Sequence, residues 1–191
     1  MAKAKEEPVK KKRIPRQKLY PVLVWIAEIA AALLLAYGVS RAFFTSVTLQ
    51  ENSMAPTIEA GDTVLINRLA FRTRKIRRGE LIAYRNGDKL DSSIHVKRVI
   101  GLPGETVTIR DGLIQINGTT YMEAQEFPSI NNAGMAGSGV TLGSNEYFVL
   151  GDNRNNCEYS RYADVGNIRS KDVVGRIWYR SAPAGRRERL R

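Results

Sequence analysis

A candidate nucleophile, Ser53, lies in residues 50–58 (QENSMAPTI), shortly after a long apolar stretch of the chain. A serine hydroxyl becomes an effective nucleophile when a neighbouring base accepts its proton. Two candidate bases, His95 and Lys97, lie in residues 94–104 (IHVKRVIGLPG). These residue types predict acyl-transfer chemistry such as peptide hydrolysis, with either side chain as the base.

The apolar segment around Lys97 is typical of a β-strand. On a strand, His95, Lys97 and Val99 share one face, because successive side chains point to opposite sides. A lysine side chain in water has a pKa of about 10.4, and only its neutral form accepts a proton. Burial favours that neutral form. A lysine between valines can therefore act as a base once the fold has buried it.

Most of the chain after residue 44 is patterned for strands rather than helices. In residues 105–122, Asp111-Gly112 and Asn117-Gly118 separate three short apolar runs, which predicts a meander with two tight turns. We expect residues 129–144, with four glycines, to form a long loop and residues 186–191 to form a polar tail. Further strands are predicted at 63–66, 80–84, 146–150 and 172–179.

Residues 19–37 carry one charged side chain, Glu28, and predict a transmembrane helix of about 28 Å. We therefore divide the chain into a basic tail (1–18), a transmembrane anchor (19–40) and a mainly β, barrel-like domain (41–191). A cleaved secretory signal is less favoured, since the apolar run is too long and Arg41 falls inside the would-be cleavage site.

The formal net charge of +11 is concentrated before the anchor. Residues 1–20 hold eight Lys or Arg against two Glu. By the positive-inside rule, the tail stays in the cytoplasm and the β domain lies outside, on the cell membrane. We expect contact with membrane lipid and none with nucleic acid, because the charge excess and the folded domain lie on opposite sides. A basic cluster within residues 72–78 faces either solvent or anionic lipid.

Four segments in this order resemble the type I signal peptidases, which use a serine–lysine dyad. They are SMAPT (53–57), GDTVLI (61–66), KRVIGLPG (97–104) and GDNRNN (151–156) with Ser160-Arg161. The short single-span form is most similar to Gram-positive members. The resemblance implies a serine endopeptidase without a cofactor that removes signal peptides with small residues at the cleavage site from exported pre-proteins.

The resemblance also implies roles for individual residues. Ser53 is the nucleophile and Lys97 the general base. Glu51 stands where relatives can carry a hydroxyl that stabilises the oxyanion, and Cys157 and Tyr159 stand where relatives usually have Ser and Asp. The expected oxyanion and substrate-binding residues are Ser53, Asn52, Met54 and His95, and the expected supporting residues are Arg98, Asp152, Cys157, Ser160 and Arg161. We expect Met54 with Phe43 and Phe44 to form an apolar surface that touches lipid.

Two alternative functions stay open. The departures at Glu51, Cys157 and Tyr159 would fit a catalytically weak or silent protein that binds signal peptides. Cys157, His95 and Arg161 would fit a sortase-like transpeptidase with a cysteine nucleophile. The single cysteine and single histidine exclude an internal disulfide and a zinc site built from several such residues.

Overall fold

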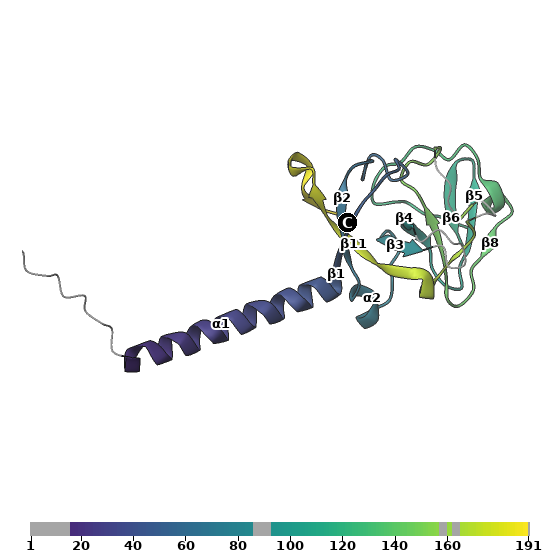
Figure 1. Ribbon diagram of the computed structural model, residues 1–191. Coiled ribbons are helices and arrows are strands. Elements are labelled where there is room, and N and C mark those ends of the chain that lie inside the picture. The colour runs from purple at the N-terminus through teal and green to yellow at the C-terminus, as the bar shows by residue number, and fades with distance from the viewer. Residues whose placement is uncertain (1–15, 86–92, 157–159, 162–164, 191) are drawn as a thin grey trace, which may run out of the picture. The chain divides into compact units, whose positions relative to one another are not determined.

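The computed structural model describes residues 16–85, 93–156, 160–161 and 165–190. The chain divides into two compact units, with the boundary between Ala42 and Phe43. The first contains one long helix and the second is mainly β (Figure 1). The predicted fold class is therefore confirmed.

Helix α1 (Arg16–Phe43) contains the one segment in the described chain that is long and apolar enough to cross a membrane, Tyr20–Arg41. These 22 residues span about 33 Å at 1.5 Å per residue, the thickness of a bilayer core. None of the span is buried inside the protein. Such a long apolar surface is unfavourable in water. The helix therefore fits a membrane anchor.

The β unit is built around one curled antiparallel sheet with the strand order β1-β2-β11-β3-β4-β9-β10, and β12 pairs with β11. The predicted strands near 63–66, 80–84, 146–150 and 172–179 all lie in it. Its members are β1 (Phe44–Thr48), β2 (Thr63–Asn67), β3 (Leu81–Arg85), β4 (Ile94–Gly101), β9 (Glu146–Leu150), β10 (Ile168–Arg169), β11 (Val173–Ala182) and β12 (Glu188–Arg189).

A second antiparallel sheet, in the order β7-β6-β5-β8, contains the predicted meander. Both central residues of each turn, Asp111-Gly112 and Asn117-Gly118, have positive φ, as a tight hairpin between twisted strands requires. In Figure 1, β5, β6 and β8 lie at the end of the β unit away from β1 and β2. The strands are β5 (Thr106–Arg110), β6 (Leu113–Ile116), β7 (Thr119–Thr120) and β8 (Val140–Thr141).

Two loop predictions need correction. The segment 129–144 contains a 3₁₀ turn and strand β8, whose pairing with β5 holds the segment against the second sheet. The last residues are not simply a polar tail, because β12 pairs with β11 and Leu190 is buried in the core. The remaining short helices are α2 (Ala70–Thr73), η1 (Gly134–Gly137), η2 (Ser170–Asp172) and η3 (Ala184–Arg186).

Strand β4 runs through the centre of the β unit, and its last six residues are buried. Val96, Ile100 and Val99 each belong to a different one of three apolar core clusters. The strand pairs with β3 along residues 94–98 and with β9 from Arg98 onward. A side chain on β4 is therefore held on several sides, which fixes the position of Lys97.

At Gly175, β11 approaches its neighbour β2 so closely that the space has no room for a side chain. A Cβ atom there would lie 2.6 Å from the carbonyl oxygen of Asn67 and 2.8 Å from Cγ2 of Ile66. We expect Gly175→Ala to lower the free energy of unfolding by about 1–3 kcal/mol, a typical cost of overpacking. Thermal unfolding of the full chain in detergent should then show a Tm lower by several degrees.

Gly185→Ala is the matched control, because no atom lies within 4 Å of a Cβ at that position. Equal Tm values for the two variants would contradict the close approach.

Candidate active site

Ser53 lies in the segment that joins β1 to β2, and its side chain is buried, with an exposed fraction of 3%. Backbone hydrogen bonds close this segment at its base, between Leu49 and Asp62 and between Gly61 and Leu49. The side chains of Met54 and Ile58 anchor it in the apolar core. The serine is therefore held on a short loop that is fixed at both ends.

Lys97 comes from the centre of β4, opposite Ile82 of β3, and is also only 3% exposed. Its Nζ lies 3.3 Å from Oε1 of Glu51, to which it donates a hydrogen bond. The hydroxyl of Ser53 donates to the same oxygen at 3.0 Å. The fold thus brings the two candidate catalytic side chains together from segments 44 residues apart, with a carboxylate joining them.

Glu51 is the residue whose role sequence reasoning missed. The resemblance indicated only that Glu51 stands where relatives can carry an oxyanion-stabilising hydroxyl, whereas here it accepts hydrogen bonds from Ser53 and Lys97. Burial raises the pKa of Glu51, but the charge of Lys97, the hydrogen bonds from Ser53 and Lys97, and the charge of His95 together bring it below its ordinary value. The signal that was available is its position, two residues before the serine.

Asn52 and Asn153 connect the serine loop to the segment after β9. The backbone N–H of Asn153 donates a hydrogen bond to the carbonyl oxygen of Ser53, at 3.2 Å. The side-chain amide of Asn153 donates to the carbonyl oxygen of Asn52, also at 3.2 Å. The side-chain oxygen of Asn52 accepts a bond from the backbone of Ala60 at 2.8 Å. Asn52 therefore braces its own loop, and its expected oxyanion role stays a prediction.

Arg98 and Asp152 form a buried ion pair next to these residues. Arg98 follows Lys97 on β4, and its guanidinium contacts both carboxylate oxygens of Asp152, at 2.7 and 2.6 Å. A third bond runs to the carbonyl oxygen of Gly79 at 2.8 Å. Because both ions are buried, the pair makes a rigid link between β4 and the segment that holds Asn153.

The remaining supporting residues lie in the same region. The hydroxyl of Ser160 accepts a hydrogen bond from the backbone of Val149 on β9, at 3.1 Å. Arg161 donates to the carbonyl oxygens of Arg154, at 2.8 Å, and of Asn132. Ser160 therefore ties its segment to β9, and Arg161 ties loops to one another. Cys157 and Tyr159 lie outside the described residues.

His95 is half-buried at the start of β4. Its ring lies 5.6 Å from that of Tyr84, and its Nε2 is 3.0 Å from the hydroxyl of Ser93. The two candidate bases are thus in different surroundings, since Lys97 contacts Glu51 and His95 packs at the strand edge.

The expectation for Met54 is wrong. Its side chain has no exposed surface and packs in the core, so it offers nothing for lipid or substrate to touch. The physical reason is that the serine loop needs an apolar anchor, and Met54 and Ile58 provide it. Phe44 is 41% exposed and contacts the ring of Trp178 at 6.1 Å between centroids.

A cleft of about 470 Å³ ends at Glu51. One wall is residues 47–51, at the end of β1, and the other is residues 93–96, at the start of β4. The described residues hold no cluster of three or more His, Cys, Asp or Glu that could bind a metal ion. The chemistry that this site can support is therefore proton transfer between a hydroxyl, an amine and a carboxylate beside an open cleft.

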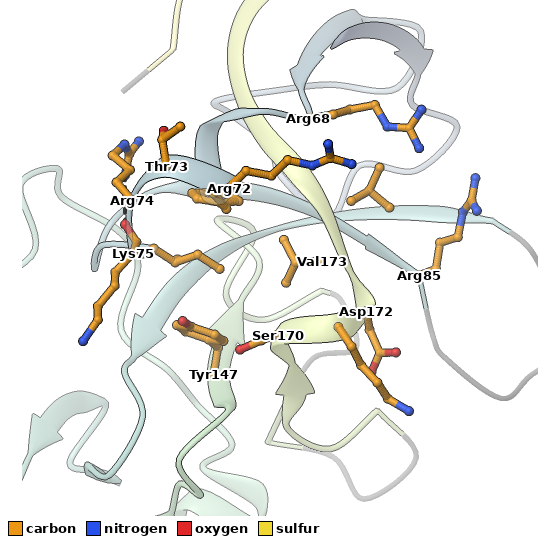
Figure 2. A pocket seen from close by; sticks show the side chains of 14 residues that line it. Arg68, Arg72, Thr73, Arg74, Lys75, Arg85, Tyr147, Ser170, Asp172 and Val173 are labelled. Carbon is orange, nitrogen blue, oxygen red and sulfur yellow. Dashed lines mark hydrogen bonds between the residues drawn. The ribbon is translucent and has the colours of Figure 1, made fainter. Parts of the chain in front are cut away.

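A larger cavity, of about 870 Å³, lies elsewhere (Figure 2). Neither Ser53 nor Lys97 is among its described lining residues. Those lining residues include the carboxylate of Asp172 and six basic side chains: Arg68, Arg72, Arg74, Lys75, Arg85 and Lys171. This basic pocket is a separate feature of the surface.

Comparison with known proteins identifies relatives along most of the chain. Residues 22–181 match the family described as "Signal peptidase, peptidase S26". Signal peptidase I V of Bacillus subtilis (strain 168) is 32% identical over 166 residues, 80% of this chain and 95% of that protein. Signal peptidase I P of Bacillus subtilis subsp. natto is 30% identical over 168 residues, 84% of this chain and 89% of that protein.

A crystal structure of a signal peptidase I from Enterococcus faecalis V583 is 31% identical and covers 54% of this chain and 97% of that chain, with a TM-score of 0.45. The family match spans both the apolar helix and the β unit with its buried serine and lysine. The chain therefore belongs to the signal peptidase family, peptidase S26.

Proposed function

We propose that the chain is a membrane-anchored serine endopeptidase that removes signal peptides from exported pre-proteins, with Ser53 as nucleophile and Lys97 as general base. The observation that carries the proposal is the meeting of these two buried side chains at one oxygen of Glu51. A hydroxyl and an amine that are both buried and both contact the same carboxylate oxygen are placed for proton transfer once they face one another. The signal peptidase family supplies the reaction and substrate class.

In the proposed reaction, the neutral amine of Lys97 takes the proton of Ser53 as the serine oxygen attacks the scissile carbonyl carbon. The backbone N–H of Ser53 and a second donor, for which Asn52 is the candidate, stabilise the oxyanion. Lys97 then protonates the leaving amine, and an acyl-enzyme forms. Water, activated by Lys97, hydrolyses that ester and regenerates the serine.

The cleft beside Glu51 suits an extended peptide. β1 is the end strand of its sheet. In the described structure, residues 94–97 of β4 pair with β3 on one side and with no strand on the other. Both segments contribute to the walls of the cleft. A substrate strand could add to these edges through main-chain hydrogen bonds, which would bring its scissile bond to Ser53. Half-buried His95 lies along this path.

Replacement of either proposed catalytic residue tests the function directly. We expect Ser53→Ala and Lys97→Met to lower kcat/KM for pre-protein cleavage at least about 100-fold, since each removes one partner of the proton transfer. His95→Ala should keep most of the activity. Gel analysis of a pre-protein incubated with the full chain in detergent or vesicles measures the cleavage.

Circular dichroism of each variant controls for folding. Activity that survives in Lys97→Met and is lost in His95→Ala would make His95 the base. Loss in Cys157→Ala with an active Ser53→Ala would favour the transpeptidase. A wild type that binds a signal peptide without cleaving it would favour the silent homologue.

The proposed location is the cell membrane, with the tail in the cytoplasm and the β unit outside. The apolar helix and the basic residues before it support this orientation. Arg68, in the wall of the basic pocket, donates its backbone N–H to the carbonyl oxygen of Phe43, the last residue of α1. By chain connectivity alone, the pocket then lies close to the point where the chain leaves the bilayer.

We therefore propose that the basic pocket contacts anionic lipid headgroups (Figure 2). Arg74 is already paired with Glu80, at 2.7 Å, so the more available charges are the exposed side chains of Arg72 and Lys75. Each basic side chain near an anionic membrane surface contributes about 1 kcal/mol of attraction.

Charge reversal tests the lipid contact. In vesicles, we expect wild-type kcat/KM to rise as phosphatidylglycerol replaces phosphatidylcholine, and the double variant Arg72→Glu/Lys75→Glu to lose most of this rise. Arg110→Glu, an exposed position on β5 in the second sheet, is the matched control and should respond as the wild type does. Equal responses of all three proteins would refute the contact.

A further inference from the structure

The contacts of Glu51 do not match a serine–lysine pair that is ready to react. For catalysis, the hydroxyl of Ser53 must give its proton to a neutral amine. In the structure both the hydroxyl and the Lys97 side chain donate to Oε1 of Glu51, at 3.0 and 3.3 Å. The hydroxyl hydrogen of Ser53 is therefore directed at the carboxylate rather than at the amine.

Glu51 is a poor candidate for the base itself. The surroundings bring the pKa of its carboxyl group below the ordinary value, so it is a weaker base than a glutamate in water. A proton acceptor for general-base catalysis is most effective when its pKa lies near the working pH. The carboxylate of Glu51 therefore positions Ser53 and Lys97 and adds a negative charge beside them, and it does not take the proton of the serine.

We propose that Glu51 is a latch: a positioning residue that holds Ser53 and Lys97 in a resting arrangement until an extended peptide enters the adjoining cleft and displaces its carboxylate. The inference rests on the proposed Ser53–Lys97 function and adds a mode of regulation to it. It gives the enzyme a way to stay inactive until substrate occupies the cleft.

Differences in burial support this release. The side chain of Glu51 is 53% exposed, whereas that of Lys97 is 3% exposed. Ser53 and Lys97 are fixed by the core, so the glutamate is the member of the trio that can rotate into solvent without disturbing packing. Glu51 also lines the cleft between residues 47–51 and 93–96. A peptide strand that fills this cleft competes for the space of the carboxylate.

Displacement changes the protonation of the site in a defined order. Once Glu51 leaves, the Lys97 side chain no longer donates to the carboxylate, and it must give one proton to solvent water before it can act as the base. The neutral amine then accepts the proton of Ser53 as the C–O bond to the substrate forms. When the C–N bond breaks, Lys97 returns that proton to the leaving amine.

Glu51→Gln tests the latch, because it removes the charge and keeps the size and an oxygen acceptor. The charged form of Lys97 is then less favoured, so a larger share of the amine is neutral at any given pH. We expect the acid limb of the kcat/KM profile for a peptide substrate to move to lower pH by about one unit, which is a tenfold gain on that limb.

Two controls isolate the effect. Glu59→Gln changes a carboxylate of similar exposure, 50%, in the same loop, and should leave the profile unchanged. His95 is the other charged group that acts on Glu51. The Glu51→Gln shift should therefore also appear in a His95→Asn background, where that charge is absent.

A small ester provides a readout that does not depend on the cleft. p-Nitrophenyl acetate is too short to fill the cleft and displace the carboxylate, so we expect slow acylation of Ser53 in the wild type and at least tenfold faster acylation in Glu51→Gln. Release of p-nitrophenolate, corrected with Ser53→Ala, measures the rate. The rate increase caused by Glu51→Gln should be larger with this ester than with a full peptide, because a full peptide displaces the Glu51 carboxylate even in the wild type.

The outcomes separate the latch from the dyad. An unchanged acid limb in Glu51→Gln, with Lys97→Met inactive, would overturn the latch and leave the dyad in place. Loss of activity in Glu51→Gln equal to that of Ser53→Ala would make Glu51 a required catalytic group and overturn the latch. An active Lys97→Met would overturn the dyad and, with it, the latch.

Discussion

The buried amine of Lys97 is the constraint on which the site depends. Burial of an ammonium group costs several kcal/mol unless a counter-ion and hydrogen bonds compensate for lost water. Lys97 lies on the central strand β4, among residues of three core clusters, and donates a hydrogen bond to one oxygen of Glu51. A neutral amine carries no such burial cost, which is the physical reason why a buried lysine is proposed as the base.

Contacts around this amine connect β4 to the loop that carries Ser53. Arg98, next to Lys97 on β4, forms a buried two-pronged ion pair with Asp152. Asn153 then hydrogen-bonds to the carbonyl oxygen of Ser53. The chain of contacts runs from the proposed base, through the ion pair, to the proposed nucleophile. The position of β4 is therefore linked to that of the serine loop.

The two units of the chain have different physical roles. The apolar span Tyr20–Arg41 fits a membrane anchor, and the β unit carries the chemistry. The backbone bond from Arg68 to Phe43 ties the basic pocket to the residue at which the helix ends.

The sequence by itself determined the long apolar helix, the strand content and the two hairpin turns, because these depend on local composition and on residues such as Asn117-Gly118 that tolerate positive φ. It also indicated Ser53 and Lys97 through the order of four motifs. Only the tertiary structure decided that Met54 is a core anchor and that Glu51 joins the serine to the lysine. Those facts depend on which side chains fill the space around residues distant in the chain, and periodicity along one strand contains no information about that packing.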